Sequence, residues 1–97
     1  MPTDLSWKGK SRSGNVPSVI GSVVVLEANA FRVGATIIND GATVKYLSKG
    51  DAAVVNAGIR LNASGGSYEI NTLNPWFGAI SVACAIAAEN INWTEDE

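Results

Sequence analysis

The sequence predicts an all-β protein: an antiparallel β-sandwich or jelly-roll-like barrel of about seven or eight short strands with an extended N-terminal arm. Three observations favour this class. Apolar and polar residues alternate with a period of two, as in "SYEIN" (residues 67–71). β-Branched residues are dense in "SVIGSVVVL" (residues 18–26). Turn-forming residues recur between these runs at intervals of about 8–12 residues.

Length and composition limit the possible functions. The 97 residues suffice for one domain and are too few for two. Charged residues make up only 16%, and the formal net charge is −2, so no global basic field would attract nucleic acid. Such low charge indicates that part of the surface is meant for a neighbour rather than for bulk water.

Residues 1–17 predict a flexible arm, because glycine, serine and proline occur there without periodicity. The sandwich domain is then expected over residues 18–97. Two interpretations of the arm stay open. It is either a solvated, frayed terminus or a tether, in which Trp7 enters a neighbour's pocket and three cations meet an acidic surface. Those cations are Lys8, Lys10 and Arg12.

Three strands are predicted in the first half, at Val19–Leu26, Ala35–Asn39 and residues 43–49. In the third, alternation places Val44 and Tyr46 on one face and Lys45 on the other.

An Asp-Gly pair, Asp40-Gly41, separates the second and third of these strands. Asp-Gly between two β-type runs predicts a β-hairpin with a type I′ turn, which needs positive φ at both central residues.

The second half continues in shorter β-type pieces. A brief strand is predicted at Ala53–Val55, and "GIRLN" (residues 58–62) directs Ile59 and Leu61 inward and Arg60 outward. A Gly-Gly turn then leads into a strand in which Tyr68 and Ile70 oppose Ser67 and Glu69.

The alanine-rich run "GAISVACAIAA" (residues 78–88) could form a helix, but its bulk alternates strictly and so predicts a strand. "NINWTE" (residues 90–95) follows as the closing strand. The small-residue face of the alternating run either packs under an internal layer or forms a subunit interface. It consists of Ala79, Ser81, Ala83 and Ala85.

The sequence predicts no enzyme, no catalytic residue, no metal site and no cofactor. It contains no histidine, which excludes Ser-His and Cys-His pairs, and the single cysteine excludes an intrachain disulfide. Cys84 lies in an apolar run and is interpreted as a small buried hydrophobe. No apolar segment suits a secretory signal or a membrane span, so we expect synthesis in the cytoplasm and no membrane partner.

Large aromatic residues stand in loop-like stretches, at Phe31 and in "NPWFG" (residues 74–78), which contains Trp76 and Phe77. They form either a hydrophobic lid over one end of the sandwich or an exposed anchor for a partner. Arg32 is expected to pair with Glu27 or with a carboxylate of a neighbour.

Three segments in order resemble small virion accessory proteins of tailed bacteriophages, such as capsid decoration (cement) and head-fibre proteins. They are "NAFRVGATIINDGATVKYLSKG" (residues 29–50), "GIRLNASGGSYEI" (residues 58–70) and "GAISVACAIAAENINWTE" (residues 78–95). The resemblance covers roughly Asn29 to Glu95. It implies a virion structural protein with a β-sandwich or jelly-roll-like fold, a homo-oligomer with a trimer favoured, and the major capsid protein as partner.

The resemblance transfers no catalytic residue. The basic arm with Trp7 and the Pro75-Trp76-Phe77 loop fall outside it, so binding specificity is expected there. Two alternative functions stay open: a tail or baseplate accessory or receptor-binding module, and a carbohydrate-binding module in which Trp76 and Phe77 stack on sugar.

Overall fold

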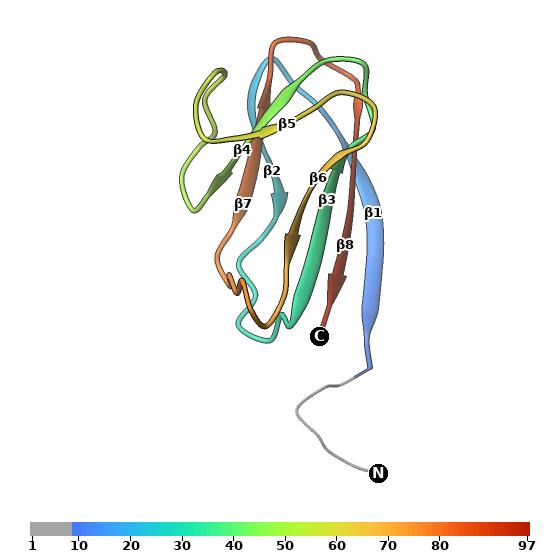
Figure 1. The fold of residues 1–97 in the computed structure, drawn as a ribbon, viewed down its shortest axis with the longest axis vertical. Helices are drawn as coiled ribbons and strands as arrows, with labels where there is room; N and C mark the ends of the chain where they lie inside the picture. The colour runs from blue at the N-terminus through green and yellow to red at the C-terminus, as the bar shows by residue number, and fades with distance from the viewer. Residues whose placement is uncertain (1–8) are drawn as a thin grey trace.

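The computed structural model describes residues 9–97, in which eight strands form two antiparallel sheets packed face to face (Figure 1). The strands are β1 Ser11–Pro17, β2 Gly21–Leu26, β3 Gly34–Asn39, β4 Lys45–Lys49, β5 Ile59–Leu61, β6 Gly66–Ile70, β7 Ile80–Cys84 and β8 Asn90–Asp96. Sheet A has the order β1-β8-β3-β6 and sheet B the order β2-β7-β4-β5. The predicted all-β antiparallel sandwich is confirmed.

The strand pairing follows one rule. β1 pairs with β8, β2 with β7, β3 with β6, and β4 with β5. The chain is therefore one long antiparallel hairpin that reverses between β4 and β5. Strands β1 to β4 form one half and β5 to β8 the other, and the paired halves are rolled up into the two sheets. The pairs β3–β8 and β4–β7 then complete the two sheets. This arrangement is the double-sheet jelly roll.

The core fills the space between the inner faces of the sheets. Ile37 and Ile91 from sheet A meet Leu47 and Ile80 from sheet B, and all four side chains are fully buried. Burying a side chain of this size stabilises the fold by about 1.5–3 kcal/mol. Alternate residues of a strand point to opposite faces, so the period-two pattern predicted Leu61 and Ile70 as inward-facing, and both are buried.

Strand β1 corrects the predicted boundary between arm and sandwich. Ser11–Pro17 is an edge strand of sheet A, in register with β8 along its whole length. It lacks apolar alternation because most of its residues are exposed and only Val16 packs against the core. Residues 1–8, which include Trp7 and Lys8, lie outside the described residues.

The Asp40-Gly41 pair does not form the predicted hairpin turn. β3 belongs to sheet A and β4 to sheet B, so the connection crosses between sheets. Neither residue has the positive φ that a type I′ turn requires. Instead, the side chain of Asn39 shapes the crossing, accepting a hydrogen bond from the Gly41 N–H (3.1 Å) and donating one to the Thr43 carbonyl (2.9 Å).

Most other predicted strands are present, with two differences. Residues 53–55 lie in the loop between β4 and β5 rather than in a strand. In β4 the predicted alternation holds, but Lys45 faces the core and is fully buried. Leu61 of β5 and Ile70 of β6 point inward as predicted, while Arg60 is exposed.

Strand β7 is buried on both faces. Cys84 is buried, as predicted, and on the outer face Ser81 and Ala83 are 5% and 0% exposed. The β4–β5 loop covers this face: the Ala53 N–H donates to Ser22 Oγ (2.9 Å), and Ser22 is the cross-strand neighbour of Ala83.

The internal-layer interpretation of the small-residue face is therefore correct for Ser81 and Ala83. Their assignment to a subunit interface is wrong, because a loop of the same chain already occupies that space. Ala79 is half-buried and Ala85, beyond the end of β7, is exposed.

A lysine at Ala83 is expected to destabilise the single chain rather than an assembly. Ala83→Lys should lower the free energy of unfolding by about 1–3 kcal/mol, because the new side chain must displace the covering loop. Ala85→Lys, two residues further along at an exposed position, should stay within about 0.5 kcal/mol of wild type. Urea unfolding followed by circular dichroism measures both, and equal stability of the two variants would contradict the covered face.

Candidate partner-binding site

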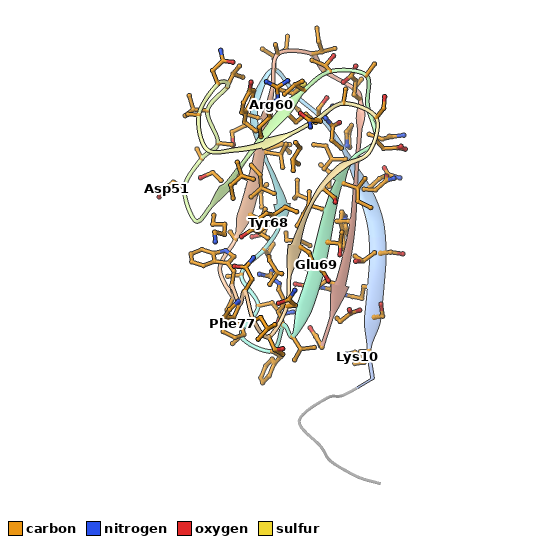
Figure 2. All side chains as sticks on the ribbon, viewed as in Figure 1. Lys10, Asp51, Arg60, Tyr68, Glu69 and Phe77 are labelled. Carbon is orange, nitrogen blue, oxygen red and sulfur yellow. The ribbon has the colours of Figure 1, made fainter. Side chains whose placement is uncertain are left out.

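Two loops at one end of the sandwich bring together aromatic residues that are far apart in the sequence. The β2–β3 loop carries Phe31, and the β6–β7 loop carries Trp76 and Phe77. The Asn29 N–H donates to the Phe77 carbonyl (2.8 Å) and so holds the two loops together. Figure 2 shows Phe77 at this end of the molecule. Three of the predicted partner-binding residues thus form one surface.

A pocket of about 390 Å³ lies between these loops. Its apolar lining includes Val33, Ile70 and Pro75 beside the three aromatic side chains, and Asn71 and Thr72 add polar groups. Phe31 and Phe77 are 62% and 51% exposed. The volume is at the lower end of the range for small-ligand pockets, about 300–1,000 Å³, so it suits one large side chain or one small ring system.

The sequence left two roles open for the loop aromatics, a hydrophobic lid and an exposed anchor, and Trp76 and Phe77 differ in which of these roles they suit. Trp76 is half-buried, packs against the core and donates its indole N–H to the Ala79 carbonyl (3.1 Å), so it acts as a lid. The ammonium of Lys49 lies 5.6 Å from its ring centroid, a cation–π contact. Phe77 is 51% exposed, so of these two residues it is the one that a partner could contact as an anchor.

Arg32 is a buried structural residue, so its predicted role in partner binding is wrong. Only 2% of it is exposed. Its guanidinium donates to Glu95 Oε2 (2.7 Å) and to three backbone carbonyls, those of Glu27 (2.6 Å), Trp76 (3.0 Å) and Gly78 (2.9 Å). The expected partner Glu27 thus contributes its carbonyl rather than its carboxylate. Arg32 ties both pocket loops to β8.

The two described cations of the predicted arm are paired within the chain. Arg12 hydrogen-bonds to Glu95 and lies over the Trp93 ring, 5.9 Å from its centroid. Lys10 lies 3.8 Å from Glu97. A partner's acidic surface would therefore have to compete with carboxylates of the chain itself.

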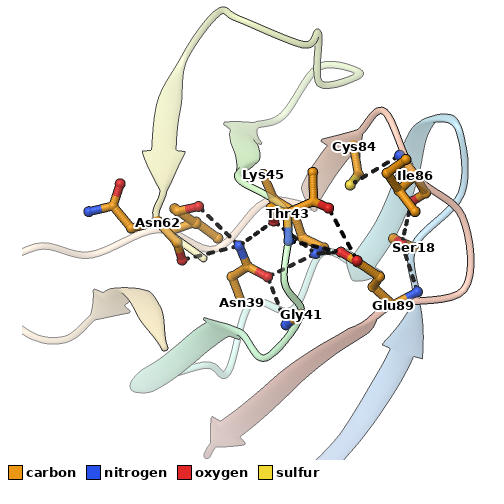
Figure 3. A network of polar contacts seen from close by, with 10 residues as sticks. Ser18, Asn39, Gly41, Thr43, Lys45, Asn62, Cys84, Ile86 and Glu89 are labelled. Carbon is orange, nitrogen blue, oxygen red and sulfur yellow. Dashed lines mark hydrogen bonds and ion pairs between the residues drawn. The ribbon is translucent and has the colours of Figure 1, made fainter. Parts of the chain in front are cut away.

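A second buried ionic network lies at the opposite end of the sandwich, where β3 ends and β4 begins. Figure 3 shows its contacts from close by. The Lys45 ammonium donates to Glu89 Oε1 (2.8 Å), to Asn39 Oδ1 (2.8 Å) and to the Thr43 carbonyl (3.2 Å). Asn39 is also fully buried. Its side-chain amide donates to the backbone carbonyls of Thr43, Leu61 and Asn62. This network fastens the sheet-crossing segment to both halves of the chain.

Both networks lower the pKa of a glutamate. The hydrogen bond from Lys45 holds the pKa of Glu89 below its usual range, against the opposing effect of burial. Burial acts to raise the pKa of Glu95, but hydrogen bonds from Arg32 and Arg12 outweigh it and the net change is downward.

The folded protein should therefore lose stability in acid. A lowered carboxylate pKa contributes stability that is complete above the unfolded-state value, about 4.3, and is lost as the pH falls through the lower folded-state values. We expect the free energy of unfolding to be nearly constant from about pH 6 to 8 and to decline below about pH 4.5. Urea unfolding across this range measures it. Glu89→Gln should flatten the decline, whereas Glu69→Gln, at an exposed site, should keep it.

Sequence reasoning missed both buried networks: Asn39, Lys45 and Glu89 at one end of the sandwich, and Glu95 with Arg32 at the other. One signal existed: Lys45 lies within a β-type run and shares a strand face with the apolar Leu47. The sequence could not show which carboxylate would meet it, because Glu89 is 44 residues away.

In residues 9–97 we find no cluster of three or more His, Cys, Asp or Glu side chains that could hold a metal ion. The same residues contain no helix with the length and apolar character needed to cross a membrane. No protein-family model, curated protein or solved structure matches the chain.

Proposed function

We propose that this protein is a virion structural protein of the capsid decoration type. It docks on the outer surface of a phage head and stabilises contacts between major capsid subunits. The observation that carries the proposal is the gathering of Phe31, Trp76 and Phe77 at one end of the jelly roll. The resemblance of three sequence segments to phage accessory proteins supplies the virion context, and the jelly roll is a fold that viral capsid proteins use.

The geometry suits docking because the aromatic end is rigid. Arg32 bonds both pocket loops to β8, so few side chains need to be ordered on binding. Aromatic anchors held in this way account for much of the binding energy in protein interfaces. On a shell with many identical seams, weak individual contacts add through multivalency.

Purified capsids lacking the protein provide the test. The wild-type chain should bind them and raise their melting temperature. Phe77→Ala should weaken binding about ten- to thirtyfold, as expected for an interface hot spot. Val54→Ala is the matched control, since Val54 is also exposed (62%) but lies in the β4–β5 loop. Binding to tails alone would instead favour the tail-module alternative.

Carbohydrate binding is the second candidate, favoured by the aromatic pocket with Asn71 and Thr72 in its lining. Aromatic rings stack on sugar faces while amide and hydroxyl groups bond the sugar hydroxyls. A glycan-array signal that disappears in Phe77→Ala, together with no capsid binding, would support this candidate and contradict the decoration role.

A further inference from the structure

The buried network between β3 and β4 holds three groups that can react with one another: an amine, a carboxamide and a carboxylate. We propose that Lys45 and Asn39 form an intramolecular isopeptide bond, with Glu89 as the base and ammonia as the product released. Nothing outside the chain is required, because the reaction exchanges one amide nitrogen for another. This inference does not depend on which partner the protein binds.

The nucleophile and the carbon that it attacks are already close together. The Lys45 ammonium donates to Asn39 Oδ1 at 2.8 Å. Because a carbonyl bond is about 1.23 Å long, Nζ lies no further than about 4 Å from Asn39 Cγ. Both side chains are fully buried, so bulk water neither separates the pair nor competes as a nucleophile. Attack needs only a shift of Nζ from the oxygen to the carbon of the same amide group.

Glu89 is placed to take the proton that Lys45 must lose. An ammonium has no free electron pair, so it cannot attack until a base accepts one of its protons. Glu89 Oε1 accepts from the Lys45 ammonium at 2.8 Å. Thr43 fixes the carboxylate, since its N–H donates to Oε1 and its hydroxyl to Oε2, each at 3.2 Å. Figure 3 shows the lysine and the carboxylate side by side at this point.

The surroundings of the Asn39 amide match the reaction intermediate better than the starting amide. Attack converts Oδ1 to an oxyanion, and the Gly41 N–H donates to this oxygen (3.1 Å). Nδ2 lies within hydrogen-bond distance of three backbone carbonyls, those of Thr43 (2.9 Å), Leu61 (3.0 Å) and Asn62 (3.1 Å). A carboxamide nitrogen carries two hydrogens, whereas the nitrogen that leaves as ammonia carries three. The three acceptors therefore favour the leaving group over the starting amide.

Gly41 leaves the space in which the reacting groups meet. A Cβ at this position would lie 2.6 Å from both Glu89 Oε1 and Lys45 Nζ, which is too close for any side chain. The Asp40-Gly41 pair makes no type I′ turn, so the need for glycine comes from the amine and the carboxylate beside it.

The step balances without another reactant. Glu89 takes one proton from the Lys45 ammonium, and the free amine attacks Asn39 Cγ, which moves the C=O electron pair to Oδ1. One proton passes from the attacking nitrogen to Nδ2, the C=O bond re-forms, and the Cγ–Nδ2 bond breaks. Ammonia leaves and takes the proton held by Glu89, so the carboxylate is restored and ammonium is released.

The product differs from the starting chain in charge and in covalent connection. The buried ammonium of Lys45 becomes a neutral amide, which removes the cost of keeping that charge from water. The new bond joins the end of β3 to the start of β4, and so joins sheet A to sheet B. The ion pair of Lys45 with Glu89, and the acid response attributed to it above, apply to chains that have not reacted.

Intact-protein mass spectrometry of the folded full chain tests the proposal. Wild type should be lighter than its calculated mass by about 17 Da, one ammonia. Glu89→Gln and Lys45→Arg should both have full mass, because the first lacks the base and the second lacks the amine nucleophile. Glu69→Gln changes an exposed glutamate and should show the same loss as wild type. Circular dichroism identifies the variants that are folded.

Peptide mapping separates this bond from other losses of ammonia, such as imide formation at another asparagine. Cleavage before Asp40 and before Asp51 cuts the backbone between the two reacting residues. In wild type, residues 40–50 should remain attached through Lys45 to the piece that ends at Asn39. This digest of wild type decides the question even where a variant does not fold.

Two results would overturn the inference. One is full mass in folded wild-type protein after prolonged incubation. The other is a loss of ammonia that leaves residues 40–50 free after the digestion, or that persists in folded Glu89→Gln.

Discussion

Replacing Arg32 with methionine is expected to cost about 3–5 kcal/mol of folding free energy, the largest loss among single substitutions considered for this chain. The change leaves the buried Glu95 carboxylate with Arg12 as its one cationic partner among the described residues, and it deprives three backbone carbonyls of their donor. A domain of this size has a total stability of about 5–15 kcal/mol, so the variant should be close to unfolding. Guanidinium unfolding monitored by tryptophan fluorescence measures the loss.

The matched control is Arg60→Met, because Arg60 is exposed on β5 and bonds only the Asn62 side chain among the described contacts. It should change stability by less than about 0.5 kcal/mol. Combining Arg32→Met with Glu95→Leu should recover much of the loss, since apolar residues of similar volume can replace a buried ion pair. If Arg32→Met is as stable as Arg60→Met, the guanidinium does not hold the end of the sandwich together.

Replacing Asn39 with leucine is expected to cost about 3 kcal/mol, because several buried groups lose their partners together. The Asn39 amide donates to backbone carbonyls of Thr43 and Leu61, and its oxygen accepts from Lys45 and Gly41. Leucine has a similar volume but no polar atom, so the loss reports hydrogen bonding rather than a cavity.

Asn15→Leu controls for the chemical change at an exposed site on β1, and it should be nearly neutral. Urea unfolding compares the two variants. Wild-type stability in Asn39→Leu would show that water or neighbouring groups satisfy these carbonyls, and that the sheet crossing does not need the asparagine side chain.

Much of the fold could be predicted because alternation reports which residues face a core. Leu61, Ile70 and Ile91 were recognisable in this way, and all three are buried. Sheet membership could not be predicted, because Asp40-Gly41 looks the same whether the next strand pairs with the previous one or crosses to the other sheet. β1 escaped prediction because an exposed edge strand needs no apolar periodicity.

The candidate site was partly predictable. Phe31, Trp76 and Phe77 stood out as large aromatics in loops, and the structure places them around one pocket. Arg32 was misjudged because a lone arginine next to an exposed aromatic is typical of a surface. Its burial depends on Glu95, which lies 63 residues further along, and on carbonyls from two other loops. A buried charge whose partners are far away in the sequence cannot be recognised from the residues next to it.

The position of β8 has a consequence for how the chain reaches its final state. β8 is the last of the described strands in chain order, yet it is an interior member of sheet A, between β1 and β3. Until β8 has been synthesised, β1 and β3 have no common partner, and Arg32 lacks its carboxylate partner Glu95. Sheet A therefore depends on pairing between distant parts of the chain, and loss of β8 would remove the shared partner of β1 and β3 rather than disturb one edge of the sheet.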